Sequence, residues 1–304
     1  MTYHKISSFD TEFQLQGFVA LCEEQFEKRM DVAISSLRDV RGMRFFGLTG
    51  PTCSGKTTAA RKMTEMLEEH GLCVRVISLD DFYFDKEYLH QRAENDPDIE
   101  IDYDSEETID IKLLSEVAER LYAGKRTEMP HFNFKSGMRE KGELLEPKKN
   151  DVFLFEGIQT LYPRVNEILN RHRSYRSISI YPQSAIEIDG KRFLPNEIRL
   201  YRRLVRDHLH RATDPEFTFY LWKSVRENEK KNIFPYLDSC HASIDSTMPY
   251  EIGMLKPYLE PLMQKILPES AFYGRAQEIL TKLQGIQPVS VRYIFERSLY
   301  KEFI

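Results

Sequence analysis

Apolar and polar positions along this chain of 304 residues fall into blocks that predict strands and helices in turn. Short apolar runs bounded by Gly, Pro or Asp are typical of buried strands, whereas apolar residues three and four apart are typical of amphipathic helices. The runs predict strands at 45–49, 72–79, 151–157, 177–182 and 241–246, and a hairpin at 186–193 around Asp189-Gly190.

The helical pattern is clearest near the start, where Phe18, Cys22, Phe26 and Met30 recur at helical spacing within 11–38. Further helices are predicted at 56–70, 109–123, 196–212 and 214–231, and through most of the last 55 or so residues. Strands that alternate with helices indicate the α/β class, with a parallel sheet covered by helices on both faces.

The segment between the first strand and its helix reads "GPTCSGKTT" and fits the pattern G-x-x-x-x-G-K-[ST]. Glycine lets successive backbone N–H groups turn toward one anion, and the start of the helix adds positive potential. We expect Lys56 to reach the β- and γ-phosphates and the Thr57 hydroxyl to bind Mg²⁺. The predicted ATP contacts from this segment are Gly50, Pro51, Thr52, Cys53, Ser54, Gly55, Lys56, Thr57 and Thr58.

Composition narrows the class of protein further. The chain is 41% hydrophobic and 30% charged, and its net charge of -5 gives no reason to expect a nucleic-acid partner. We see no apolar run of membrane-spanning length and no signal-peptide pattern, and the four cysteines include no C-x-x-C pair. These features predict a cytoplasmic globular protein with no membrane partner.

Carboxylates follow two of the predicted strands. Asp80 and Asp81 come directly after 72–79, and Glu156 ends the run at 151–157. Ligands of parallel sheets bind at the carboxyl ends of the strands, where an acid can hold Mg²⁺ or accept the proton of an attacking hydroxyl. A single aspartate here would more often cap a turn, but three acids beside one phosphate-binding loop favour chemistry.

Four arginines share one face of the helix at 196–212. Arg199, Arg202, Arg203 and Arg206 lie at i, i+3, i+4 and i+7, while Glu197 and Asp207 are the acids nearest in sequence. Like charges on one face repel unless an anion neutralises them. We therefore predict a lid helix over the phosphates, with a solvated surface helix as the alternative.

Taken in order, several segments resemble the uridine kinase and phosphoribulokinase family of P-loop kinases. They are "GPTCSGKTT", "ISLDDFYFD", "DYDSEETID", "MPHFNFKSGMR", "FLFEGI", "IRLYRRLVRDHLHR" and "NIFPY", which together span roughly 44–267. The resemblance implies a P-loop NTPase fold with a kinase domain at 42–267 and a lid at about 186–231. Helical extensions are expected at 1–41 and 268–304.

The resemblance also implies roles for single residues. Asp80 matches the base for the acceptor hydroxyl, Asp104 the residue that bonds ribose hydroxyls, and Glu156 the acid near Mg²⁺, while Asp81 ranks below Asp80. The implied catalytic pair is Lys56 and Asp80, with Thr57 and Glu156 as metal ligands. The remaining contacts are Arg202, Arg203 and Arg206 to ATP, and Asp80, Asp104, Phe132, Arg139 and Arg199 to the acceptor.

Two positions depart from the family pattern. Phe132 and Gly137 stand where uridine kinases usually carry a tyrosine and a histidine that contact the pyrimidine, and Gly137 is expected to leave space there. The implied activity is transfer of the γ-phosphoryl group of ATP, with Mg²⁺, to a primary hydroxyl. A ribonucleoside such as uridine or cytidine, giving the 5′-monophosphate, is the first candidate.

Two alternatives stay open at this point. One is a kinase of another sugar-like or vitamin-like alcohol, and the other is a nucleotide-dependent switch or ATPase. A homo-oligomer is compatible with the sequence.

Overall fold

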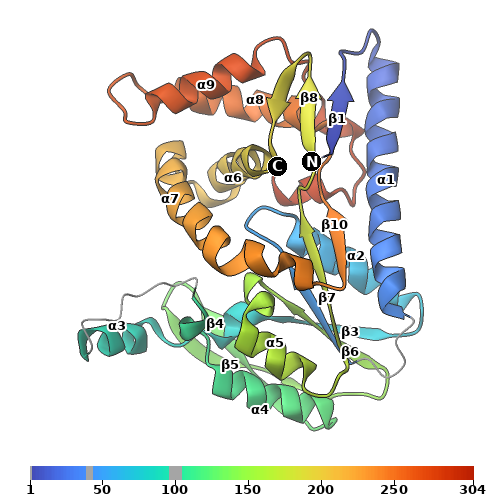
Figure 1. Cartoon of the computed structure of the whole chain (residues 1–304), viewed down its shortest axis with the longest axis vertical. Helices are drawn as coiled ribbons and strands as arrows, with labels where there is room; N and C mark the ends of the chain where they lie inside the picture. The colour runs from blue at the N-terminus through green and yellow to red at the C-terminus, as the bar shows by residue number, and fades with distance from the viewer. Residues whose placement is uncertain (1, 39–43, 96–104) are drawn as a thin grey trace.

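A central sheet of five parallel strands organises the protein, which is described by a computed structural model over residues 2–38, 44–95 and 105–304 (Figure 1). The strand order is β10-β7-β2-β6-β3. The strands are β2 (Phe45–Thr49), β3 (Cys73–Ser78), β6 (Asp151–Glu156), β7 (Tyr175–Tyr181) and β10 (Ala242–Asp245). The predicted α/β class is confirmed.

The sheet buries both of its faces, because consecutive side chains of a strand point to opposite sides. In β2, Phe46 and Leu48 join one core cluster, while Phe45 joins the other. The first cluster includes α1 (Glu12–Arg38) and α2 (Lys56–Glu68); the second includes α4 (Ile111–Tyr122) and α5 (Pro163–Asn170). Helices therefore cover both faces, as the near-continuous apolar strands require.

A small second sheet extends the fold beyond the central one. It has the order β1-β8-β9 and consists of β1 (Tyr3–Ile6), β8 (Ala185–Ile188) and β9 (Lys191–Phe193). Asp189 and Gly190 both have positive φ, 47° and 80°, which makes the predicted hairpin turn between β8 and β9. The sequence did not reveal β1, because its partner strand lies far away in the chain.

Four helices of the C-terminal half contribute buried residues to the same core cluster as α1. They are α6 (Pro195–Arg211), α7 (Pro215–Asn228), α8 (Glu251–Gln264) and α9 (Tyr273–Leu283). Asp214 caps α7 as expected, since its side chain accepts from Glu216 N. Within the described ranges, no helix combines the length and apolarity that crossing a bilayer requires.

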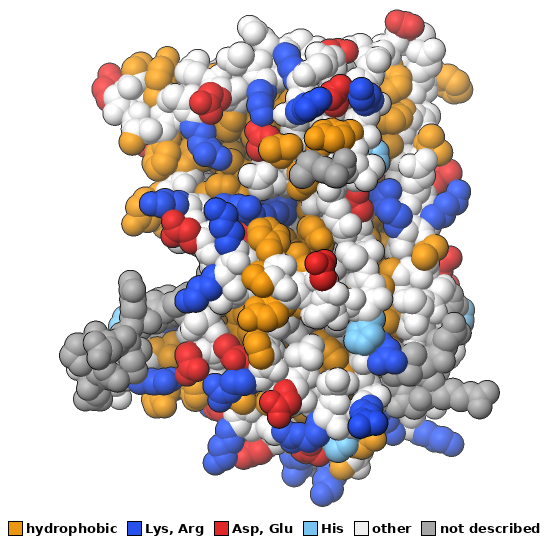
Figure 2. All heavy atoms as spheres, in the orientation of Figure 1, with side chains coloured by type: hydrophobic (Ala, Val, Ile, Leu, Met, Phe, Trp, Pro, Cys, Tyr) orange, Lys and Arg blue, Asp and Glu red, His pale blue; other side chains and the backbone are white. Residues whose placement is uncertain are grey.

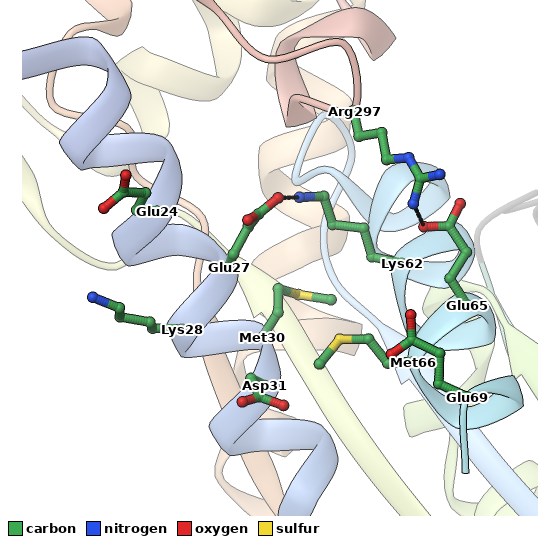
Figure 3. Close-up of a pocket in the computed structure, with 10 residues that line it drawn as sticks. All are labelled: Glu24, Glu27, Lys28, Met30, Asp31, Lys62, Glu65, Met66, Glu69 and Arg297. Atoms are coloured by element: carbon green, nitrogen blue, oxygen red, sulfur yellow. Dashed lines mark hydrogen bonds and ion pairs between the residues drawn. The ribbon is translucent and has the colours of Figure 1, made fainter. Parts of the chain in front are cut away.

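The terminal segments share this core rather than standing apart from it. Buried side chains of α1 and of the last six residues belong to the same cluster as β2. Two ion pairs fix them to α2: Lys62 Nζ lies 2.8 Å from Glu27 of α1, and Arg297 lies 2.9 Å from Glu65 (Figure 3). The division into a domain and two extensions stays a prediction.

Local pattern did not predict α3 (Lys86–Asn95), α5, or the antiparallel pair β4 (Thr127–Asn133) and β5 (Met138–Leu145). The sequence of β5, "MREKGELL", is mostly polar, and all but its last residue are exposed or half-buried. A strand that buries so little carries no strong alternation. This strand forms because it pairs with β4, and a local sequence pattern does not reveal such a pairing.

A fully buried arginine joins α6 to α8. Arg202 makes a bidentate ion pair with Glu251, with Nε–Oε2 at 2.8 Å and Nη2–Oε1 at 3.1 Å. Its remaining N–H groups donate to Cys53 O, Ser246 Oγ and Ser246 O, so all five donors of the guanidinium are satisfied. Tyr300 also donates to Glu251, which ties the C-terminal segment to the pair.

Glu251→Gln should strongly destabilise the fold, because it leaves the Arg202 charge buried without a counter-charge. Breaking a buried pair from one side costs about 3–5 kcal/mol, and urea denaturation measures it as a loss of unfolding free energy. Glu260→Gln is the matched control on the same helix, since Glu260 pairs with Lys256 at a partly exposed site and should cost under about 0.5 kcal/mol. Equal losses in the two variants would contradict the central role of the buried pair.

Candidate functional site

A pocket of about 470 Å³ opens at the carboxyl end of the central sheet. On this side the molecule is hollowed between the part that carries α7 and the part that carries α3, and Lys and Arg side chains gather at the edge nearer α7 (Figure 2). The pocket brings together side chains from the loop after β2, the turns after β3 and β6, and α6 and α7. They include Thr52, Lys56, Asp80, Tyr83, Glu156, Gln159, Arg203, Arg211 and Glu229.

Strand order explains why the predicted acids meet. β6 lies between β2 and β3, and Glu156 stands level with Leu48 on one side and with Ser78 on the other. The loop after β2 and the turn that carries Asp80 therefore flank Glu156. Lys56, Asp80 and Glu156 line the same pocket, whereas Asp81, the third acid expected there, is not among its lining residues.

The segment 50–57, here called the phosphate loop, packs tightly against the sheet. A Cβ on Gly50 would lie 2.1 Å from Ile180 O, so only glycine fits beside β7. Lys56 Nζ donates to Gly50 O at 2.9 Å and to Pro51 O at 3.3 Å, which holds the ammonium group over the loop. Thr57 is exposed at the first turn of α2. The Lys56 ammonium group and the Thr57 hydroxyl are the side-chain groups that a phosphate-binding loop requires.

Two arginines of α6 hold the phosphate loop from behind. Arg199 Nη1 donates to Thr52 O at 3.2 Å, and Arg202 Nη1 donates to Cys53 O at 3.3 Å. In a trans peptide the N–H points opposite to the C=O. Fixing these two carbonyls therefore turns the N–H groups of Cys53 and Ser54 away from the arginines, which suits a nest of amides for an anion.

For Arg199 and Arg202, the neutralising anion is a carboxylate of the chain itself and not the expected phosphate. Glu229 binds Arg199 with both oxygens, at 2.5 and 2.7 Å, and Glu251 binds Arg202. Both arginines are almost completely buried, at 2% and 0% exposure. They contact the loop backbone here, whereas the sequence had assigned Arg202 to ATP and Arg199 to the acceptor.

Positive charge is in excess further along α6. Arg203, Arg206 and Arg211 all approach the single carboxylate of Asp207, at 3.1, 2.7 and 3.7 Å. The three cations outnumber this carboxylate and Glu302, whose charge also acts on Arg206, and Arg203 and Arg211 line the pocket. An anion in the pocket would relieve their mutual repulsion. Sequence reasoning missed Arg211, which lies outside the i, i+3, i+4, i+7 set.

The surroundings of Glu156 suit a carboxylate that could hold a cation. Burial raises the pKa of its carboxyl group, and the charge of nearby Lys56 offsets this only in part. Its Oε2 atom is buried and has no hydrogen-bond partner among the described residues. Over the same residues there is no cluster of three or more His, Cys, Asp or Glu that could cage a metal. The partnerless oxygen of Glu156 could hold Mg²⁺, which proteins bind through one or two carboxylates together with substrate phosphates.

The two aspartates after β3 differ in their surroundings. Asp81 Oδ1 accepts from Phe132 N at 2.9 Å and contacts His131 Nδ1 at 3.2 Å, so it anchors β4. Asp80 lines the pocket and accepts from Gln159 Nε2 through Oδ1 at 2.7 Å. The ranking of Asp80 above Asp81 fits this geometry. Gln159 was missed, although it follows the end of β6 by three residues.

Two of the residues predicted to contact the acceptor, Phe132 and Arg139, are not among the lining residues of the pocket. Phe132 is buried edge-on against Tyr83 and Phe134. Arg139 Nη1 pairs with Asp110 at 3.0 Å and lies outside the described lining of the pocket. Asp104 falls outside the described residues.

The space expected at Gly137 is absent. A Cβ there would lie 2.6 Å from Lys86 Cδ, so the side chain of Lys86 fills the position. The φ of Gly137 is also +71°, a value that strains any other residue. Gly137 is therefore explained by the turn between β4 and β5.

Comparison with known proteins agrees with this geometry. The Phosphoribulokinase / Uridine kinase family matches residues 45–252, which is more than half of the chain. The uridine kinase of Clostridium novyi (strain NT) is 30% identical over 161 residues, which cover 53% of this chain and 66% of that enzyme. The uridine kinase of Clostridium perfringens (strain SM101 / Type A) is 31% identical over 165 residues, or 54% and 67%. The chain thus spans about two thirds of the length of these relatives.

Among solved structures, a possible uridine kinase from Bacillus stearothermophilus aligns with 73% of this chain and all of its own. Its sequence identity is 15% and its TM-score is 0.48. A similarity at that level adds nothing to the description of the site.

The raised pKa of Glu156 makes stability depend on pH. A carboxyl group that releases its proton less readily when folded contributes stability below its ordinary pKa of 4.5, and that contribution is lost as pH rises through the raised value. In Glu156→Gln no carboxyl group ionises at this position, so this loss of folding stability does not occur. The melting temperature of the variant should therefore exceed that of the wild type, by a difference that grows above about pH 4.5. Thermal melts from pH 4 to 8 without Mg²⁺ measure this. Parallel curves, or the same effect from exposed Glu143→Gln, would contradict it.

Proposed function

The chain belongs to the phosphoribulokinase / uridine kinase family, and we propose that it is an ATP-dependent kinase of a primary hydroxyl group. One observation carries the proposal: Lys56, Asp80 and Glu156 line one pocket, beside an arginine group with surplus positive charge. This set supplies what phosphoryl transfer needs from a protein, namely a phosphate cradle, a metal-side carboxylate and a proton acceptor.

The phosphate loop and α6 would hold the donor. Backbone N–H groups of 50–58 and the ammonium group of Lys56 suit the phosphates of ATP, and Arg203, Arg206 and Arg211 suit the charge of the transferred group. Thr57 and Glu156 would hold Mg²⁺, which neutralises the phosphate oxygens when it is bound. Arg199 and Arg202 act behind the loop and keep its amides oriented.

Asp80 would orient the acceptor hydroxyl and take its proton. Gln159 donates to Oδ1 of Asp80, so one oxygen is fixed in place and Oδ2 is the atom we assign to the acceptor. The amide of Gln159 also donates to the hydroxyl of Tyr83, which lines the same pocket. A base oriented in this way would be ready to accept the proton of a hydroxyl group bound beside Oδ2.

A ribonucleoside is the first acceptor we propose, since the two relatives described above are named uridine kinases. A different sugar-like alcohol is the second, and one observation favours it. Phe132 is buried against its neighbours and Lys86 fills the place of Gly137, so the base contacts usual in uridine kinases are not provided by these two positions. Discrimination between uridine and cytidine should therefore be weak.

Release of ADP in the presence of single acceptors tests the activity. A panel of ribonucleosides and small polyols is offered with ATP and Mg²⁺, and the products are identified by mass spectrometry. We expect ADP release to depend on at least one acceptor, which gains a phosphoryl group. Acceptor-independent turnover, or turnover that needs a protein partner, would contradict a kinase and favour an ATPase or switch.

Asp80→Asn should lower kcat about 10²–10⁴-fold, because it keeps the shape and removes the proton acceptor. The Kd for ATP should change little. Asp81→Asn is the matched control, since an amide oxygen can still accept from Phe132 N and anchor β4. If Asp81→Asn proves the more damaging change, the assignment of the base is wrong by one residue.

A further inference from the structure

The C-terminal segment lies on the start of α2, next to the phosphate loop. Leu299, Tyr300 and Phe303 are fully buried, and Leu299 packs on Gly55, where a Cβ would meet Leu299 Cδ1 at 2.1 Å. Ten residues further along the chain, in α2, Glu65 forms an ion pair with Arg297 that holds the same segment (Figure 3). This segment is therefore a fixed part of the wall around the phosphate loop.

An acid of this segment occupies donors of the phosphate site. Glu302 Oε2 accepts from Thr58 N at 3.3 Å and from Thr58 Oγ1 at 3.4 Å. Thr58 is in the first turn of α2, where backbone N–H groups have no partner within the helix. Those groups are the ones that a phosphate loop offers to a nucleotide. The carboxylate thus stands where a phosphate oxygen would bind.

We propose that Glu302 belongs to the donor site and competes with a nucleotide phosphate for Thr58, so that it sets the affinity for the nucleotide. The inference rests on the proposed function, because it assumes that the phosphate loop binds ATP. Carboxylate and phosphate are both anions, and they cannot share the same two donors without strong repulsion.

The burial of Glu302 and of its neighbours indicates how a phosphate could displace this carboxylate from Thr58. The carboxylate of Glu302 is half-buried, whereas the side chains that fix its segment are fully buried. Rotation of one side chain therefore frees Thr58, and the segment itself stays in place. The negative charge of Glu302 also acts on the pocket beside it, since burial first, and then the charges of Asp80 and Glu302, raise the pKa of Glu156.

Glu302→Gln tests the proposal, because glutamine keeps the length and an oxygen that accepts from Thr58 while the charge is lost. We expect the Kd for ATP to fall about tenfold in isothermal titration calorimetry, as charged hydrogen bonds exceed neutral ones by this order. Tripolyphosphate should gain by the same factor, because the competition concerns phosphate and not the base. Glu296→Gln, an exposed acid of the same segment, is the matched control and should match the wild type.

The outcomes separate this inference from the proposed function. Tighter ATP and tripolyphosphate binding in Glu302→Gln alone supports it. Equal or weaker ATP binding in Glu302→Gln overturns it and leaves the kinase assignment intact. A gain that Glu296→Gln shares overturns it too, since net charge would then explain the effect. If the wild type and both variants fail to bind ATP, the donor site itself is wrong and the inference falls with it.

Discussion

Arg202 and Glu251 meet where solvent does not reach, and four parts of the chain converge on their ion pair. The guanidinium comes from α6 and the carboxylate from α8, while Cys53 O of the phosphate loop and the Tyr300 hydroxyl complete the contacts. The rings of Tyr300 and Phe303 lie 5.6 and 5.2 Å from the guanidinium carbon. A buried charge is tolerable only when every donor is satisfied, so none of these parts can move independently.

This constraint changes the meaning of the arginine row on α6. The same helical face performs two tasks. Arg199 and Arg202 fix the backbone of the phosphate loop. Arg203 and Arg206 share the single carboxylate of Asp207, so their positive charge is only partly neutralised. The first pair gives the loop its shape before any ligand arrives. The second pair provides surplus positive charge that can bind an anion. Helix α6 therefore both supports the phosphate loop and presents positive charge beside it.

Sequence reasoning succeeded where the determining contacts are local. The phosphate loop follows its strand and opens its helix within about a dozen residues, and the acids at the ends of β3 and β6 follow from strand geometry alone. It failed where partners are distant. Glu229 and Glu251 lie 30 and 49 residues from the arginines they neutralise, and Glu302 lies 244 residues from Thr58. The prediction of open space at Gly137 failed for the same reason, because the side chain of the distant Lys86 fills that space.

Lys56 is the residue on which the central claim depends, namely that the phosphate loop is the site of phosphoryl transfer. The most direct test is kcat for acceptor-dependent ADP release by Lys56→Ala, with its unfolding free energy measured alongside. Among the described residues, the hydrogen bonds of the ammonium group go to the loop carbonyls of Gly50 and Pro51, so the fold should persist within about 1 kcal/mol while kcat falls about 10²–10³-fold. Turnover near that of the wild type would show that the phosphate loop is not the active nucleotide site.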